Sequence, residues 1–328
     1  MPAPEELRLG TRGSPLALWQ ANAVAESIAR TGGPRCRIVV IRTSGDHLVN
    51  APLSEVGGKR LFVKEIEDAL VRREIDLAVH SSKDMPAVLP DGLAIAAVLP
   101  RADPHDAVVL PASRQETIAT LGELVAALGQ APSIGTGSVR RVAQLRRLFT
   151  SARFMPIRGN LETRLRKLDS GEHDALVLAA AGLHRLGFAG RISFALPAGA
   201  CVPAPGQGIV AVEVRDDAEA VRRVVALIDD AATGAALRAE RALVEALGGG
   251  CQTPIGAMAS VMDDETIEIV AAVVTVDGHR LLRTAASGPL GEAAVIGVRA
   301  ARQLLEEGAG DILAEARQVH AAVEGIQP

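Results

Sequence analysis

Apolar positions in the first third of the chain follow a helical pattern in some segments and a strand pattern in others. Ser14 and Pro15 suit the capping and first positions of a helix, and apolar residues then recur at roughly helical spacing up to Ile28. The other expected elements are strands at residues 37–41 and 75–79, a helix at residues 64–73 and a polar loop at residues 80–84. Strands that alternate with helices indicate an α/β fold with a largely parallel sheet.

The same order of elements returns in the second third of the chain. The segment LGTRGSPLALWQ, residues 9–20, matches IGTGSVRRVAQL, residues 134–145: each passes from a strand through a glycine-containing turn into a helix. A helical pattern at residues 161–168 then precedes a strand pattern at residues 174–180, as in the first third. We therefore expect two similar α/β domains that face one another.

The rest of the pattern predicts how these domains connect and where a third begins. PAPGQG, residues 203–208, is typical of a crossing segment, and the strand pattern that follows predicts a return to the first domain. Further on, Asp277–Gly278 is a hairpin signal between two strand patterns, with helical patterns on either side. The expected domains are residues 1–101 with 208–228, residues 102–207, and residues 229–328, the last of them a smaller α+β domain.

Composition excludes several classes of protein. The 328 residues are 48% hydrophobic with a net charge of −4, which is too apolar for a disordered chain, and the apolar runs are far shorter than the roughly 20 residues of a membrane span. Aromatic residues make up only 2% of the chain, so the stacking platforms of a nucleic-acid binder are missing. Residues 1–10 have neither a basic start nor an apolar run, so we expect no signal peptide and a cytoplasmic protein.

The basic residues are 31 arginines and only 4 lysines. Codon usage in a GC-rich genome explains such an excess, and so does a need for fixed bidentate grips on anions. Arg12 and Ser14 lie at the first strand-to-helix turn, and Arg140 and Arg141 at the second. Because a helix N-terminus attracts anions, these positions favour a polyanionic ligand, whereas Arg222–Arg223 fits a solvated helix face.

Two further segments carry candidate chemistry. Lys83 and Asp84 lie in the polar loop after a buried strand, at the edge where ligands of α/β sheets collect, although Asp84 also suits a turn ahead of Pro86. Cys251 lies between three glycines and Thr-Pro, after a helix C-terminus that disfavours a thiolate and with no histidine within twenty residues. A buried structural thiol is one interpretation of Cys251. Covalent attachment of a group fits better than a turnover nucleophile.

Several motifs together resemble the porphobilinogen deaminase (hydroxymethylbilane synthase) family. In chain order they are TRGSPLALWQA, GGKRLFVKEIEDAL, DLAVHSSKDMP, IGTGSVRR, IRGNLETRLRKL, PAPGQG and GGGCQTPIG, and they span nearly the whole chain. The resemblance implies two α/β domains like those of periplasmic binding proteins, with the active cleft between them, and a third domain. It also implies a dipyrromethane cofactor, built from the enzyme's own substrate and held by thioether to a loop cysteine.

By this resemblance Cys251 anchors the cofactor and Asp84 is the catalytic carboxylate that stabilises the cation formed as ammonia leaves. The other cofactor-binding residues implied are Ser81, Lys83, Asp84, Thr136, Ser138, Arg140, Arg141, Gly159 and Arg164. The substrate-binding residues implied are Arg12, Ser14, Gln20, Arg158, Arg164 and Arg185, with Lys59 and Phe62 on a loop and no metal. Asp46 is a lesser candidate. The sequence departs from some relatives at Glu55, where they have a lysine, and at His184, where a basic residue often stands.

The predicted function is that of a transferase which deaminates porphobilinogen and polymerises it into the linear tetrapyrrole hydroxymethylbilane. The alternative is a non-catalytic two-lobed binding module for a small anion, which explains the anion-binding helix starts but neither Cys251 nor the Lys83–Asp84 pair. A thiol hydrolase is disfavoured because nothing near Cys251 in sequence activates it. We expect a monomer with porphobilinogen as its partner and no binding to nucleic acid or membrane.

Overall fold

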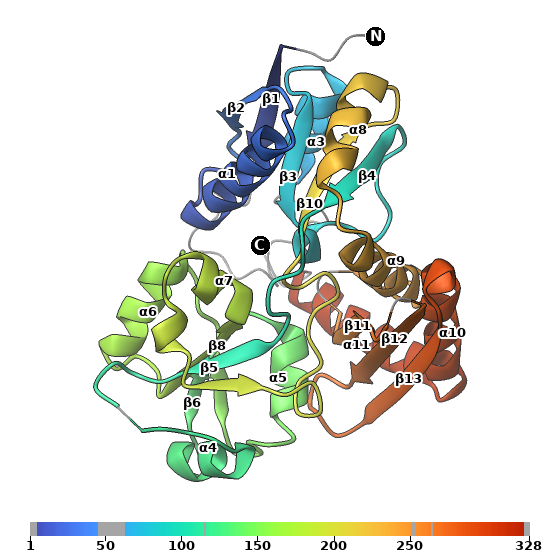
Figure 1. The fold of residues 1–328 in the computed structure, drawn as a ribbon. Coiled ribbons are helices and arrows are strands. Elements are labelled where there is room, and N and C mark those ends of the chain that lie inside the picture. The colour runs from blue at the N-terminus through green and yellow to red at the C-terminus, as the bar shows by residue number, and fades with distance from the viewer. Residues whose placement is uncertain (1–4, 45–62, 115, 251–252, 264, 325–328) are drawn as a thin grey trace.

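The computed structural model describes residues 5–44, 63–114, 116–250, 253–263 and 265–324, which build three sheets with their helices (Figure 1). The first sheet has the order β2-β1-β3-β10-β4, in which β1 pairs parallel with β2 and β3, and β10 pairs antiparallel with β3 and β4. The strands are β1 (Glu6–Thr11), β2 (Arg35–Val40), β3 (Leu77–Ser81), β4 (Leu93–Val98) and β10 (Val210–Arg215).

Helices cover both faces of this sheet, and we call the sheet and its helices the first lobe. These helices are α1 (Pro15–Arg30), α3 (Lys64–Val71) and α8 (Glu219–Val225), with the short helices η1 (Ser82–Asp84) and η3 (Ala226–Ile228). Apolar side chains of α1 and α8 pack on one face, and those of α3 pack on the other. The α/β pattern read from the first third of the sequence therefore forms a three-layer unit.

The second sheet repeats this arrangement, with the order β7-β6-β8-β5-β9 and β5 as its antiparallel strand. Its strands are β5 (Asp106–Val109), β6 (Ser133–Gly135), β7 (Arg153–Met155), β8 (Ala175–Ala179) and β9 (Phe194–Leu196). Its helices are α4 (Leu121–Leu128), α5 (Val139–Leu145), α6 (Leu161–Asp169), α7 (Ala180–Arg185) and η2 (Ala189–Arg191). Helices α4 and α5 pack on one face, and α6 and α7 on the other, which completes the second lobe.

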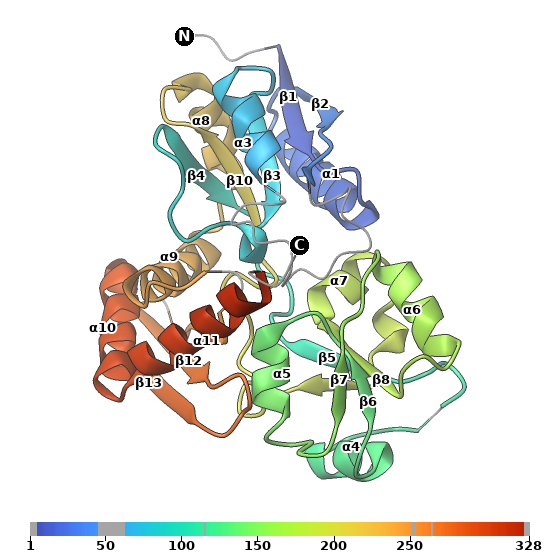
Figure 2. The same ribbon diagram turned by 180° about the vertical axis from the view of Figure 1, so that it is seen from behind.

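A third unit joins an antiparallel sheet to three helices, and Figure 2 shows it beside the second lobe and below the first. Its elements are β11 (Ile255–Val261), β12 (Thr266–Val274), β13 (Leu281–Pro289), α9 (Ala231–Ala246), η4 (Leu290–Glu292), α10 (Ala293–Glu306) and α11 (Ala309–Glu324). The predicted hairpin is confirmed, because β12 pairs with β13 around Asp277–Gly278 and Gly278 has a φ of 80°. The predicted fold class, two similar α/β domains with a smaller α+β domain, is confirmed as well.

Two segments carry the chain between the lobes, residues 99–105 and residues 197–209, and they run side by side. The amide of Ala102 donates to the carbonyl of Gly208 at 3.1 Å, and that of Leu99 donates to Val210 at 3.1 Å. A Cβ at position 208 would lie 2.4 Å from the Ala102 carbonyl oxygen, and the φ there is 86°, so only glycine fits. PAPGQG thus lies in the second of these crossings.

One element boundary was wrong. His80 and Ser81 were expected in a polar loop, yet they form the end of β3, because Ala211 and Val210 of β10 pair with them. The partner strand comes from more than a hundred residues away, so no local pattern indicated it. Among the described residues, no helix has both the length and the apolar character needed to cross a membrane.

Candidate active site

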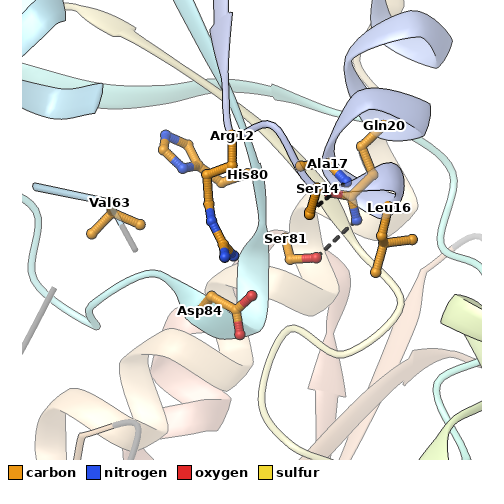
Figure 3. A pocket seen from close by; sticks show the side chains of 9 residues that line it. All are labelled: Arg12, Ser14, Leu16, Ala17, Gln20, Val63, His80, Ser81 and Asp84. Carbon is orange, nitrogen blue, oxygen red and sulfur yellow. Dashed lines mark hydrogen bonds between the residues drawn. The ribbon is translucent and has the colours of Figure 1, made fainter. Parts of the chain in front are cut away.

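A cavity of about 50 Å³ lies in the first lobe where β1 and β3 end (Figure 3). The residues that line it are Arg12, Ser14, Leu16, Ala17, Gln20, Val63, His80, Ser81 and Asp84. Ser14 caps α1 by accepting from the Ala17 amide at 3.3 Å, and the Gln20 amide nitrogen donates to Ser81 Oγ at 2.8 Å. The first lobe therefore brings four predicted substrate or cofactor residues, Arg12, Ser14, Gln20 and Ser81, to Asp84.

The charges in this cavity face each other. Figure 3 shows the Arg12 side chain extending toward the Asp84 carboxylate, with Ser81 beside them. His80 also lines the cavity, and its Nε2 lies 3.0 Å from Oε2 of Glu213. The His80 and Glu213 side chains are 3% and 0% exposed, so they form a buried polar pair behind the cavity, and the sequence reasoning missed both.

In the second lobe, the two arginines at the start of α5 converge on one buried carboxylate. Arg140 Nη1 donates to Asp106 Oδ2 at 2.7 Å, and Arg141 Nε donates to Asp106 Oδ1 at 2.9 Å. Burial alone would raise the pKa of Asp106, but the two guanidinium groups outweigh it and hold that pKa well below its usual range. Both arginines were expected to face an anionic ligand, and much of their hydrogen bonding is instead internal.

Lys83 joins this cluster from the first lobe. Its Nζ donates to Gln207 Oε1 at 3.4 Å, and Gln207 Nε2 donates to Asp106 Oδ1 at 2.9 Å. Burial and the nearby Arg141 charge lower the pKa of Lys83 to about 8, against the opposing influence of Asp84. A crossing-segment glutamine thus connects Lys83 of one lobe to Asp106 of the other.

A second cavity, of about 90 Å³, lies where all three units meet. Lys83, Ser138 and Arg140 line it together with Gly250 and Thr253, the described residues on either side of Cys251. Within the part of the chain that the structure describes, the buried Nε of Arg140 has no hydrogen-bond partner. This cavity therefore offers cationic and hydroxyl donors beside Gly250 and Thr253, which flank Cys251 in the sequence. Cys251, Lys59, Phe62, Asp46 and Glu55 themselves lie outside the described residues.

The remaining predicted arginines lie nearby in the second lobe. Arg164 Nε donates to the Gly159 carbonyl at 2.9 Å, and Gly159 has a φ of 106°. Burial, then the charges of Arg141 and Arg158, lower the pKa of Arg164 to about 10, while Asp84 acts in the opposite sense. Asp84 thus lies within electrostatic reach of this arginine group. The hydroxyl of Thr136, at the start of the same turn, accepts from the Ser138 amide at 3.4 Å.

Arg185 is placed differently, since it lines neither cavity. Its Nη2 donates to the Gly208 carbonyl at 2.7 Å, and its guanidinium carbon lies 5.4 Å from the centre of the Trp19 ring. His184, noted as a departure from relatives, is the exposed residue before it in α7.

A buried ion pair at the junction of the three units was not predicted. Arg101 of the first crossing donates to Glu240 Oε1 at 2.6 Å, and the Gly206 and Ala259 amides donate to the same carboxylate at 2.5 and 2.7 Å. Glu240 lies on α9 between two buried apolar residues, three positions after Leu237 and three before Leu243. The sequence did carry a signal for this ion pair, because a charged residue among the apolar positions of one helix face needs a buried partner.

Known proteins place this architecture in a family. Residues 7–223 match the family model described as porphobilinogen deaminase, dipyromethane cofactor binding domain, and residues 235–306 match the porphobilinogen deaminase C-terminal domain. The porphobilinogen deaminase of Geobacter metallireducens is 45% identical over 323 residues, covering 98% of each chain. That of Syntrophobacter fumaroxidans is 44% identical over 310 residues, covering 94% of this chain and 97% of its own.

Among solved structures, an ancestral cationic amino acid solute binding protein aligns over 68% of this chain and 87% of its own, at 14% identity and a TM-score of 0.41. The full-length relatives favour the predicted transferase over the binding module. They also confirm the resemblance read from the motifs, and the first family model confirms the predicted cofactor. The chain belongs to the porphobilinogen deaminase family.

Proposed function

We propose that this chain is a transferase that deaminates porphobilinogen and joins it stepwise into the linear tetrapyrrole hydroxymethylbilane. The observation that carries the proposal is the placement of Asp84. It lies in a cavity beside Arg12 and within electrostatic reach of Lys83 and Arg164, so that one carboxylate is set among several cations. Such a group suits a substrate that carries two carboxylates and develops one positive charge.

Each elongation step breaks one bond and forms another. The bond between the aminomethyl carbon of porphobilinogen and its nitrogen breaks, and the nitrogen leaves as ammonia. The same carbon then bonds to the free α-carbon of the preceding pyrrole, which loses its hydrogen as a proton. Asp84 accepts from pyrrole N–H groups and stabilises the cation that develops on the substrate as ammonia leaves.

The donors at the second cavity fit a dipyrromethane, whose acetate and propionate groups need cationic partners. The Nε of Arg140, which has no partner among the described residues, is a buried donor that a carboxylate would satisfy. Lys83, Ser138 and Arg140 would hold the cofactor there, with Ser81, Thr136, Arg141, Gly159 and Arg164 around them and Cys251 as its thioether anchor. When bound, the cofactor supplies the pyrrole carbon from which the chain grows.

Substrate carboxylates are assigned to Arg12, Ser14, Gln20, Arg158, Arg164 and Arg185, and Lys59 and Phe62 are assigned to a loop. The proposal also includes three domains with boundaries near residues 101, 207 and 228, a monomer, a cytoplasmic location and no nucleic-acid partner. The pairing of β10 with β3 and β4 supports assigning the segment after the second crossing to the first domain.

Intact-mass analysis of the purified protein tests the cofactor assignment. We expect a mass increase equal to one dipyrromethane, mapped by peptide digestion to Cys251 and absent from Cys251→Ser. Cys36→Ser is the matched control, because Cys36 is a half-buried thiol on edge strand β2, and this variant should keep the adduct. An active but unmodified chain, or an adduct on Cys36, would refute the assignment.

Asp84→Asn tests the catalytic role separately. This variant should keep the adduct and lose turnover by about 100-fold or more, because the amide no longer offers a negative charge to the developing cation. The control is Asp91→Asn. Asp91 is an exposed aspartate that follows β3 and η1 in the chain, and its substitution should leave turnover unchanged. Near-normal turnover in Asp84→Asn would mean that another group stabilises the cation.

A further inference from the structure

The two lobes touch directly where α1 of the first meets α7 of the second. Both Figure 1 and Figure 2 show α7 next to the end of α1. A Cβ at Gly182 of α7 would lie 3.9 Å from Leu16 Cδ2 of α1, which is ordinary van der Waals contact. Leu16 also lines the Asp84 cavity, so this interface forms one side of the candidate active site.

A cation–aromatic stack lies at this interface. The Arg185 guanidinium carbon is 5.4 Å from the centre of the Trp19 ring, within the range of a favourable cation–π contact. The Trp19 residue remains 40% exposed, so the ring lies at the rim of the interface rather than in a core. Trp19 and Gln20 are neighbours on α1, and Gln20 faces the cavity.

The same guanidinium is tied to the crossing segment. Its Nη2 donates to the Gly208 carbonyl at 2.7 Å, and Gly208 is the residue at which the two crossings pair. Arg185 of the second lobe therefore contacts Trp19 of the first lobe and also donates to Gly208 in the second crossing segment.

The hydrogen bonding of Arg185 is incomplete. Its Nε is buried and finds no acceptor among the residues that the structure describes. A buried N–H without a partner is costly, and an anion is the partner that a guanidinium accepts best. Burial of the group without a carboxylate beside it lowers the pKa of Arg185 to about 10.

We propose that Trp19 is a positioning residue. By stacking on Arg185 it forms a contact between the two lobes, which we call the clasp. This contact holds the Nε–H of Arg185 in place for a carboxylate of the incoming pyrrole. The identity of that carboxylate rests on the function proposed above. The clasp itself does not, because it is a contact between two side chains of this protein.

Trp19 emission reports on the clasp without any turnover. The chain has one tryptophan and no tyrosine, so the intrinsic emission of the holoenzyme comes from Trp19. Arg185→Leu should increase acrylamide quenching by up to about 2.5-fold, the ratio of full exposure to the present 40%. Arg30→Gln, which removes an exposed arginine at the end of the same α1, should leave quenching unchanged. Equal quenching in wild type and Arg185→Leu would overturn the clasp.

Kinetics test the positioning role. Trp19→Leu should raise KM for porphobilinogen about 2- to 5-fold, the range that corresponds to an exposed cation–π contact, with kcat within about twofold of wild type. Trp19→Phe, which keeps an aromatic face, should recover part of the loss. In the Arg185→Leu background, Trp19→Leu should add less than about 1.5-fold, because the stack is already gone.

Independent, multiplying effects of the two substitutions would overturn the positioning role. A loss in kcat alone would do the same, since it places Trp19 in the chemical step and not in substrate positioning. If no covalent dipyrrole is found on the chain, the proposed function fails while the quenching result still decides the clasp. If the adduct is present and quenching is unchanged, the clasp fails alone.

Discussion

The two strand-to-helix turns have nearly the same local structure and put their arginines to different uses. In each lobe a serine caps the helix, Ser14 for α1 and Ser138 for α5. Arg12 at the first turn lines the Asp84 cavity. Arg140 and Arg141 after the second turn are only 4% and 7% exposed and pair with Asp106.

The cause of this difference lies on the antiparallel strand of each sheet. Asp106 opens β5 and pairs in register with Ala179, the last residue of β8. The equivalent strand of the first lobe is β10, where Val210 pairs with Ser81, the last residue of β3. A carboxylate stands in the second lobe where the first lobe has a valine. Arginines near the second turn are therefore drawn inward, whereas the arginine of the first turn lines the Asp84 cavity.

Removal of that carboxylate should have the largest effect. Asp106→Asn leaves the two buried guanidinium groups of Arg140 and Arg141 without a counter-charge, and we expect the free energy of unfolding to fall by about 3–5 kcal/mol. Urea unfolding measures it. Asp169→Asn, which loses a surface pair with Arg191 in the same lobe, should cost less than about 1 kcal/mol. Equal losses of unfolding free energy in the two variants would mean that the buried Asp106 cluster stabilises the fold no more than a surface ion pair does.

The same cluster should also make the free energy of unfolding depend on pH in acid. The folded state holds the pKa of Asp106 well below the unfolded value of about 3.9, so its stabilisation is complete above that pH and is lost as the pH falls further. Between about pH 4 and 2, the wild-type unfolding free energy should therefore fall more steeply than that of Asp106→Asn. Parallel slopes would contradict this assignment.

The next largest effects distinguish the two kinds of arginine. Arg12→Leu should lower kcat/KM by about 10- to 100-fold, as expected for loss of a charged hydrogen bond to substrate, and leave urea stability within about 1 kcal/mol of wild type. Arg140→Leu should lower stability by about 2–4 kcal/mol and also impair cofactor assembly, because it removes one of the two cations paired with Asp106. Similar stability losses in both variants would erase the distinction between the lobes.

The sequence predicted the two lobes because their strand and helix periods are local properties of short segments. It also indicated that Arg12, Ser14 and Asp84 lie at the ligand-binding edge of a sheet, since the carboxyl ends of parallel strands share one edge. Gln20 and Ser81 were implied only by the family resemblance, and His80 was missed. It did not predict that Arg140 and Arg141 pair with Asp106, which lies 34 and 35 positions earlier. Nor did it predict the end of β3, which depends on a partner strand from beyond the second lobe. Those features depend on tertiary pairing, for which a single sequence carries no local signal.

Lys83 gives a smaller, pH-dependent test of how the lobes cooperate. Because its pKa is lowered to about 8, Lys83 loses its positive charge as the pH rises through that value, and its hold on carboxylates weakens. KM for porphobilinogen should therefore rise between about pH 7 and 9 in wild type. Lys83→Met should start from a higher KM and show a flatter profile. Lys64→Met, which removes an exposed lysine paired with Asp68, should keep the wild-type profile, and an unchanged profile in Lys83→Met would rule out Lys83 as its source.

The smallest effects come from the two capping serines. Ser14→Ala removes the acceptor for the Ala17 amide at the start of a 16-residue helix, and it should cost about 1 kcal/mol of unfolding free energy in urea. Ser138→Ala removes the equivalent acceptor for the Arg141 amide, but α5 is also tied down at this end by two guanidinium groups on Asp106. Its first turn therefore keeps its place without the cap, and we expect a loss below about 0.5 kcal/mol. In the Asp106→Asn background the loss at Ser138 should rise to about 1 kcal/mol, because the start of α5 then lacks both ion pairs. A cap cost at Ser138 that is the same in both backgrounds would show that the ion cluster does not hold the helix start.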